Sequence, residues 1–342
     1  MEKLYAGIDL HATSLQLCIV GTDLEPRIER TLRCDPARVV SALEPFGSLD
    51  VAFESCFNWY WLADALQDAG HTPHLAHALA VHMITRAKVK TDRRDALKLA
   101  RLLATGMLPE GYIHPRDSRT VRDLVRRRTG LVGARARGYS SIRHLLYRHG
   151  LVDHSRNAAK TWEERDLDAL LPDGPARLLA RQELARIALL SEQVRELEER
   201  ILAAASPESG YLRLSQIPGF GNALSAIVFY ETGDASRFPS ARHFASYCRL
   251  VPGTADSAGS SKRGRGSRQG NPHLKSAFTQ AAQCAVRHYP LLRAFYERQA
   301  SRHPGRASKL VATCILGHRL ASAAYHILKE GTDYRDDLLF TV

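Results

Sequence analysis

The sequence predicts an α/β domain at the N-terminus, followed by a mainly α-helical remainder. Short apolar segments, partly β-branched, open the chain and then alternate with helical patterns. A long arginine-rich segment with helical periodicity follows, and the last third holds apolar helical segments around one glycine- and serine-rich stretch. A chain of 342 residues is long enough for two or three domains.

The N-terminal part alternates strand and helix patterns. Strands are expected at Tyr5–Asp9, Leu15–Thr22, Ile28–Cys34, Asp50–Ser55 and Thr72–Ala76. Helices are expected at Pro36–Phe46, Trp59–Ala69, Ala78–Ile84 and Lys88–Gly106, the last with Thr91 as its N-cap.

Four acids stand at positions where burial would be costly. Asp9 and Glu54 each end an apolar strand, and Asp92 and Asp95 are three apart on a helix. We expect both helix carboxylates to point toward the protein body, although acids in a first turn are also favoured by the helix dipole. If the four converge at one sheet edge, they suit one or two Mg²⁺ ions. His11 is expected to be a polar loop residue and not a ligand.

The charge of the chain points to a polyanionic partner. The formal net charge is +12, and residues 1–110 carry 12 Lys and Arg against 14 Asp and Glu, so the excess lies C-terminal to residue 110. Between Arg116 and Arg148 a predicted helix holds ten arginines against two aspartates. The alternative is a solvated charged face. Candidate nucleic-acid contacts there are Arg126, Arg127, Arg128, Arg135 and Arg137.

The middle of the chain shows a coiled-coil pattern. Pro172 to Pro175 predicts a linker, and apolar residues recur every three or four positions over Leu184–Ile201. This seam is expected to pack on the Arg116–Arg148 helix, or on a second copy of the chain.

The C-terminal part combines apolar helices with two glycine-containing segments. Helices are expected after Gly221 and at Phe238–Cys248, His273–Arg287 and Lys309–Lys329. The segment Pro218-Gly219-Phe220-Gly221 resembles a helix-hairpin-helix turn, in which backbone N–H groups at Gly219 and Gly221 would bind phosphate; a plain tight turn is the alternative.

The stretch Asp256–Lys275 is too polar to form a core. Its glycines allow close backbone approach, and its basic residues suit a phosphate backbone. Ser257, Ser260 or Ser261 could act as a nucleophile, while a flexible basic loop is the alternative interpretation. The candidate contacts are Lys262, Arg263, Arg265 and Arg268.

The six cysteines include no CxxC pair, which argues against a zinc knuckle and a disulfide framework and favours a reducing cytoplasm. Neither a signal peptide nor a membrane-spanning apolar run is expected from the sequence.

Four segments together resemble the insertion-sequence 110 family of DEDD transposases, which act as bridge-RNA-guided serine recombinases. They are GIDLH with Asp9, AFES with Glu54, KTDRRDA with Asp92 and Asp95, and the run from IPGFG through FASYCRLVPGTADSAGSSKRGRGSRQGNPHLK with Ser257. They occur in the family's order and span most of the chain.

The resemblance implies an α/β RuvC-like (RNase H-like) domain over 1–110, a basic helix and coiled-coil region over 111–206, and a mainly α transposase domain over 207–342. It implies that the four acids hold Mg²⁺ and that Ser257 attacks DNA, in a site assembled between protomers of a dimer to tetramer. It also implies donor and target DNA and a structured guide RNA as partners.

Ser257 is chosen over the other serines because it lies five residues after Pro252, the family's place for the nucleophile. The family usually has glycine directly after this serine, whereas this chain has Ala258. Two other functions fit the residues: a metal-dependent RuvC-like nuclease acting on branched DNA, and a non-catalytic nucleic-acid-binding protein.

Overall fold

A computed structural model describes residues 2–84, 91–151, 163–171, 174–251, 254–257, 260–263, 269–303, 305–336 and 339; for 254–257 and 260–263 it describes the backbone alone. The chain forms two compact units, Met1–Arg116 and Asp117–Val342. Across the described ranges, the helices are too short or too polar to cross a membrane. The three-part division expected from the sequence stays a prediction.

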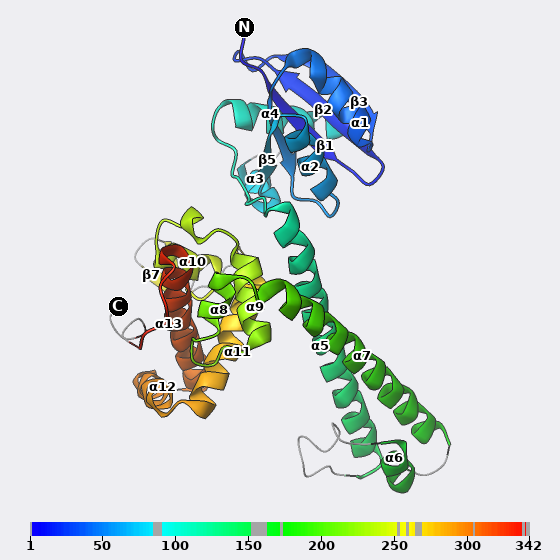
Figure 1. Cartoon of the computed structure of the whole chain (residues 1–342), viewed down its shortest axis with the longest axis vertical. Coiled ribbons are helices and arrows are strands. Elements are labelled where there is room, and N and C mark those ends of the chain that lie inside the picture. Colours follow the sequence, from blue (N-terminus) through cyan, green and yellow to red (C-terminus); the bar gives the residue numbers. More distant parts are fainter. Residues whose placement is uncertain are drawn as a thin grey trace. The chain divides into compact units, whose positions relative to one another are not determined.

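The N-terminal unit is built on one five-stranded mixed sheet (Figure 1). Its order is β3-β2-β1-β4-β5, with β1 antiparallel to β2, β2 antiparallel to β3, and β1, β4 and β5 parallel. The strands are β1 (Tyr5–Leu10), β2 (Ser14–Val20), β3 (Pro26–Arg33), β4 (Asp50–Glu54) and β5 (Thr72–Ala76). All five lie where the sequence predicts them, so the predicted α/β class is confirmed.

The two faces of the sheet carry different helices because successive side chains of a strand alternate in direction. Ala6, Ile8 and Leu10 pack into a core with α1 (Pro36–Leu43) and α2 (Tyr60–Asp68). The intervening positions of β1, which include Gly7 and Asp9, face the other side. The remaining N-terminal helices are η1 (Glu44–Phe46), α3 (Ala78–Ile84) and α4 (Asp92–Ala104), and α4 packs against β1, β2 and β4.

Small residues let α4 lie close to the sheet. A Cβ at Gly7 would lie only 2.1 Å from the carbonyl oxygen of Ala96 and 2.5 Å from the amide nitrogen of Ala100. Ala96 and Ala100 are fully buried with Cys18 of β2 beneath the helix. Glycine at position 7 therefore allows a contact between helix and strand backbones that a larger residue would block.

Helix α4 begins at the predicted N-cap. Thr91 has extended backbone angles, and its Oγ1 accepts a hydrogen bond from the N–H of Arg94. The described helix begins at Asp92; of the predicted span Lys88–Gly106, residues 88–90 lie outside the described residues.

Over its described residues, the C-terminal unit is helical, as the sequence predicts, apart from one short hairpin. Its helices are α5 (Arg116–Arg148, whose first residue belongs to the N-terminal unit), α6 (Glu164–Leu170), α7 (Pro175–Ala205), α8 (Ser209–Leu214), α9 (Asn222–Thr232), η3 (Ala235–Arg237), α10 (Ala241–Tyr247), α11 (Pro272–His288), α12 (Pro290–Arg302) and α13 (Ser308–Glu330). The hairpin is β6 (Thr254–Ser257) with β7 (Ser260–Arg263).

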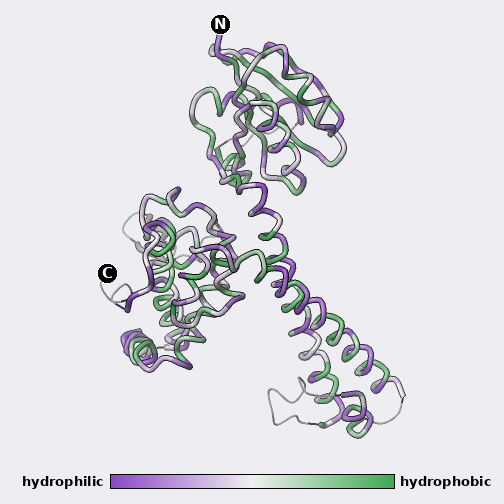
Figure 2. Tube along the Cα trace, viewed as in Figure 1, coloured by the Kyte–Doolittle hydropathy of each residue, from purple (hydrophilic) through white to green (hydrophobic). Residues whose placement is uncertain are grey.

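Helices α5 and α7 lie side by side in opposite directions (Figure 1). The α7 residues Ile187, Val194 and Ile201, one heptad apart, are buried. Gly138 of α5 packs directly against Ile187. Hydrophobic positions recur between hydrophilic ones along both helices (Figure 2). The predicted seam therefore packs on the arginine-rich helix of the same chain, while supercoiling of the pair stays a prediction.

A second core joins α8 to α13 with one end of α5 and α7. At its centre Phe244 stacks on Tyr325 and meets Phe278 edge to face, and Ala-rich faces of α11 and α13 pack on one another. This core carries the hairpin β6-β7 between α10 and α11.

Candidate metal centre and nucleic-acid interface

Two of the four acids lie on neighbouring strands at the same level of the sheet. Ile8 of β1 pairs in parallel register with Phe53 of β4, and Asp9 and Glu54 are the next residues along. Neighbouring strands are about 5 Å apart, so the two side chains share the α4 face of the sheet at its carboxyl edge. The side chain of Asp9 is only 13% exposed.

The first turn of α4 brings the other two acids to the same edge. Asp95 is 13% exposed, and one of its carboxylate oxygens lies 3.1 Å from Nζ of Lys98. Asp92, by contrast, is 64% exposed. The expectation that both point toward the protein body is therefore wrong for Asp92, because the first residue of the helix lies at its exposed tip, before the helix is covered by the sheet.

His11 lies between two of these acids, which the sequence did not predict. Its Nε2 is 3.3 Å from Oδ2 of Asp9 and 3.2 Å from Oδ2 of Asp92. Ligand atoms of these three residues lie within 4.8 Å of one another. The side-chain amide of Asn58 donates to the carbonyl of His11 at 2.9 Å and so fixes the turn after β1. The local sequence Asp9-Leu10-His11 alone does not predict that His11 lies between two acids.

Asp9 interacts electrostatically with the other three acids and with His11. Burial raises the pKa of Asp9, His11 lowers it, and repulsion from Asp95, Asp92 and Glu54 raises it further. A cation bound beside Asp9 would offset this repulsion and favour its charged form. Carboxylate oxygens are the ligands that hard divalent cations prefer, and a histidine nitrogen beside them is compatible with several such metals. The residues present therefore fit a divalent metal ion.

The serine predicted as nucleophile ends the first strand of the hairpin. In the antiparallel pair β6-β7, Ser257 stands opposite Ser260, Asp256 opposite Ser261 and Ala255 opposite Lys262. Arg263 pairs with Thr254 at the open end. Ala258, Arg265 and Arg268 lie outside the described residues. The hairpin thus places three serines and two basic residues on a ladder of four residue pairs.

The five arginines proposed for nucleic-acid contact on α5 have different surroundings. Arg126 is bound to the buried carboxylate of Glu231, Arg128 lies 2.9 Å from Oε1 of Glu198, and Arg135 donates to the hydroxyl of Ser191. Among the described residues, exposed Arg127 and Arg137 make no such bond. In this structure these two guanidinium groups are therefore available to a ligand, whereas Arg126 and Arg128 are engaged within the protein.

The two glycines of the predicted phosphate-binding turn also differ. Gly219 is buried with φ +86°, and a Cβ there would lie 2.3 Å from the carbonyl oxygen of Ala281 on α11. This close packing explains why residue 219 is a glycine. The backbone of Gly219 faces α11 and not solvent. Gly221 is exposed, caps α9 without a side-chain hydrogen bond, and meets nothing within 4 Å. Gly221 is therefore the exposed glycine of this turn, at the start of α9.

Buried Glu231 of α9 is not among the residues that the sequence predicts to be functional. Its side chain is fully buried, and burial alone would raise its pKa, but Arg126, Arg122 and Asn271 outweigh burial and lower the pKa to about 2. A single glutamate in an apolar helix gives no signal of this kind, since its partners are distant in sequence.

Comparison with known proteins gives two family matches. Residues 6–150 match a DEDD transposase model described as "Transposase", and residues 211–297 match the model "Transposase IS116/IS110/IS902 family". A Sinorhizobium fredii protein named as a transposase, y4qE, is 30% identical over 82% of this chain and 71% of its own length. The transposase for insertion sequence element IS1328 of Yersinia enterocolitica is 25% identical over 82% of this chain and 84% of its own.

Among solved structures, RuvC of Thermus thermophilus with a Holliday junction substrate is 19% identical, with a TM-score of 0.26 over 32% of this chain and 99% of its own. The two family models match segments that hold all four acids and Ser257, in the order expected from the sequence. The chain belongs to the IS116/IS110/IS902 family of transposases.

Proposed function

We propose that this transposase cleaves and rejoins DNA strands through a covalent link to Ser257, with Mg²⁺ bound by the acids of the N-terminal unit and a structured RNA as guide. The observation that supports the proposal is geometric: Asp9 and Glu54 follow paired residues of β1 and β4, and His11 and Asp92 of α4 lie within ligand distance of Asp9. A transposase of this family must act on phosphodiesters, and such a cluster suits that chemistry.

The metal site would consist of Asp9, Glu54, Asp92 and Asp95, with His11 beside it. Bound Mg²⁺ would polarise the phosphate and stabilise the charge that develops on it. The protein's own contribution is to hold the carboxylates at one sheet edge. Gly7 allows α4 to approach β1, and the Thr91 cap fixes where the helix begins.

The serine step exchanges one phosphoester bond for another. Oγ of Ser257 forms a bond to phosphorus, the bond between phosphorus and the 3′ oxygen breaks, and the serine proton leaves to a base while the 3′ oxygen gains one. The products are a phosphoserine link to the 5′ strand and a free 3′ hydroxyl. Attack by a different 3′ hydroxyl on that link reverses the step and joins new strands, without ATP. Lys262, Arg263, Arg265 and Arg268 would neutralise the phosphate oxygens.

Partner recognition would rest on the basic C-terminal unit. Arg127, Arg137 and the amides at Gly221 are exposed and suit the phosphates of donor DNA, target DNA or the guide RNA. We also propose that the active form is a dimer to tetramer and that the acids and Ser257 acting on one phosphate belong to different protomers. The three-part division at residues 110 and 206 belongs to the same proposal.

Covalent trapping tests the central step. End-labelled DNA carrying the element's ends is incubated with protein, RNA and Mg²⁺, and the products are separated under denaturing conditions. The wild type is expected to give labelled protein, Ser257→Ala none at normal nucleic-acid affinity, and the matched control Ser261→Ala a normal amount. Strand joining by Ser257→Ala would contradict the proposal, and cleavage without any attached protein would indicate a metal-dependent nuclease that uses water.

The guide is tested by sequencing the nucleic acid that co-purifies with the protein. A discrete RNA encoded beside the protein's own reading frame is expected. A random sample of cellular RNA would contradict RNA guidance while leaving the serine chemistry untouched.

A further inference from the structure

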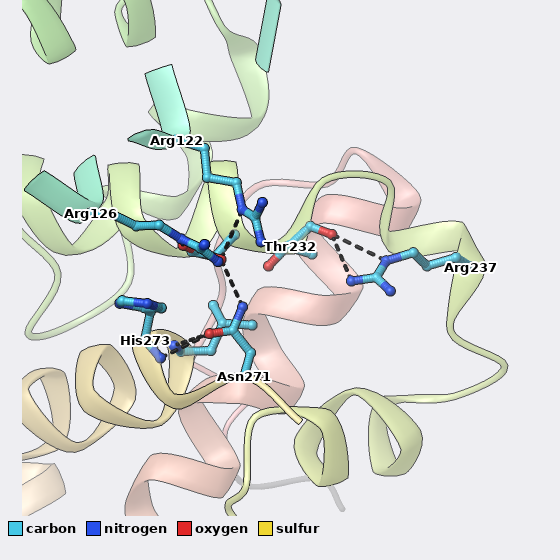
Figure 3. A network of polar contacts seen from close by, with 8 residues as sticks. Arg122, Arg126, Thr232, Arg237, Asn271 and His273 are labelled. Carbon is cyan, nitrogen blue, oxygen red and sulfur yellow. Dashed lines mark hydrogen bonds and ion pairs between the residues drawn. The ribbon is translucent and has the colours of Figure 1, made fainter. Parts of the chain in front are cut away.

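A buried polar network connects α5, α9 and the start of α11, the helix that follows the hairpin β6-β7 (Figure 3). Its centre is Glu231, in the interior of the C-terminal unit on α9 and fully shielded from solvent. Oε2 accepts from Nε of Arg122 at 3.1 Å and from Nη2 of Arg126 at 2.9 Å, and Oε1 accepts from Nε of Arg126 at 2.5 Å. The carboxylate thus binds two guanidinium groups of α5 at once.

Asn271 connects this carboxylate to the helix that follows the hairpin. Its Nδ2 donates to Oε2 of Glu231 at 2.8 Å, and its Oδ1 accepts from the N–H groups of His273 and Leu274 at 2.8 and 3.2 Å. The same side chain therefore caps α11 through its oxygen and binds Glu231 through its nitrogen, two separate atoms that a side chain with a single polar atom does not offer.

The segment that contains the hairpin β6-β7 is closed at its base, where residues 247–249 meet residues 269–271. These two short stretches form the stem of the serine hairpin. The N–H of Asn271 donates to the carbonyl of Tyr247 at 2.7 Å, and Nε of Arg249 donates to the carbonyls of Gln269 and Gly270. Gly270 has φ +94°, and a Cβ there would lie 2.3 Å from the carbonyl oxygen of Tyr247. The chain thus leaves α10 and returns to α11 through a tightly packed stem.

We propose that Glu231 is a positioning residue for Ser257: through Asn271 it fixes the stem of the serine hairpin to the arginine-rich helix α5. This inference rests on the proposed role of Ser257 as nucleophile. A nucleophile on a hairpin of two four-residue strands has little support of its own, so the position of its hydroxyl depends on the stem. A displacement of about 1 Å can slow attack by up to about a hundredfold.

The arrangement also relates the hairpin to nucleic acid bound along α5. Arg127 is exposed on the turn of α5 whose neighbour Arg126 binds Glu231. A phosphate bound by Arg127 would therefore be held in place relative to the stem, because the neighbouring Arg126 binds Glu231 and Glu231 binds Asn271. Arg126, expected from the sequence to contact nucleic acid, has instead the role of joining α5 to the stem.

The test distinguishes the hydrogen bond between Asn271 and Glu231 from the capping of α11 by Asn271. Asn271→Ser keeps a side-chain oxygen that can cap α11, but this shorter side chain cannot also reach Glu231. Glu231→Asp keeps the charge but is one methylene shorter, so that it cannot reach all three partners. Tyr325→Phe is the matched control, because it removes a buried hydrogen bond to Phe238 in the same core without touching the stem.

Three quantities are measured for each variant in the full-length protein. They are the DNA dissociation constant, the rate of covalent adduct formation at saturating DNA, and hydrogen exchange of backbone amides in residues 269–274. For Asn271→Ser and Glu231→Asp we expect unchanged affinity, an adduct rate lower by about ten- to a hundredfold, and faster exchange in the stem. For Tyr325→Phe we expect wild-type values of all three.

Adduct formation at the wild-type rate in Asn271→Ser, or a reduction no greater than in Tyr325→Phe, would overturn the positioning role and leave the serine chemistry intact. A wild type that forms no adduct at all would instead overturn the proposed function, and the inference with it. Unchanged exchange in residues 269–274 of both variants would show that Glu231 does not hold the stem.

Discussion

Replacing Gly7 by alanine tests how the metal centre is positioned. The added Cβ would lie 2.1 Å from the carbonyl oxygen of Ala96 and 2.5 Å from the amide nitrogen of Ala100. Both are backbone atoms of a buried helix, so the helix must move away from β1 by about 1 Å to restore an ordinary van der Waals contact. Because α4 carries Asp92 and Asp95, the movement separates them from Asp9.

Overpacking of this kind costs about 1–3 kcal/mol, and we expect about 2 kcal/mol here, since alanine offsets part of the cost by restricting the unfolded chain. Affinity for Mg²⁺ or Mn²⁺ should fall at least about tenfold, because ligands need placement within about 0.5 Å. Denaturation followed by the fluorescence of Trp59, which is buried in the same unit, gives the stability, and titration calorimetry gives the affinity.

Gly111→Ala is the matched control in the same unit, because its Cβ would lie 3.4 Å from the nearest atom, the carbonyl oxygen of Leu75. This variant should change neither quantity. A Gly7→Ala protein with wild-type stability and cation affinity would refute the argument that close approach of α4 to β1 assembles the site.

Three further predictions concern charge. Asp9→Asn removes a buried carboxylate that its acidic neighbours repel, so the N-terminal unit without bound metal should become more stable to denaturant while cation binding is abolished. An equal decrease in stability and in cation affinity would contradict the electrostatic argument. The pKa of Glu231 is lowered to about 2 from 4.5, so the ionised carboxylate contributes about 3 kcal/mol to the free energy of unfolding. This contribution is complete above about pH 4.5 and is lost as the pH falls toward 2. The difference in unfolding free energy between wild type and Glu231→Gln, followed by circular dichroism, should therefore shrink over that range and not at neutral pH. Replacing exposed Arg127 and Arg137 by glutamine should weaken nucleic-acid binding and lower its salt dependence by about one ion for each phosphate that is no longer bound, whereas Arg128→Gln, which breaks a pair with Glu198, should leave the salt dependence unchanged.

Much of the N-terminal fold follows from local pattern. The strands are short, apolar and separated by polar turns, and Thr91 marks the start of α4, so periodicity and capping were sufficient. The convergence of Asp9 and Glu54 was also predictable, because parallel strands bring their carboxyl ends to one sheet edge.

Features that depend on partners far along the chain were not predictable. His11 reaches Asp9 and Asp92 only because of how its turn, held by Asn58, meets the tip of α4. The exposure of Asp92 depends on where the sheet ends beneath the helix, which helical periodicity does not show.

The same limit applies in the C-terminal unit. An arginine run suggests phosphate, yet Arg126 finds its partner in Glu231, which follows about a hundred residues later and is buried by the second core. Gly219 has the sequence of a phosphate-binding turn, but its small size serves contact with α11. In both cases packing between distant segments, and not local sequence, decides the role.

The central claim is that the acidic cluster and Ser257 act on the same phosphate. Adduct formation on DNA with a sulfur in place of one oxygen of the scissile phosphate tests this most directly, with Mg²⁺ and with the more thiophilic Mn²⁺ compared. We predict that sulfur slows formation of the Ser257 adduct in Mg²⁺ and that Mn²⁺ restores it in the wild type but not in Asp9→Asn. An adduct that forms equally fast in Asp9→Asn, or a sulfur effect that is the same with both metals, would contradict the account.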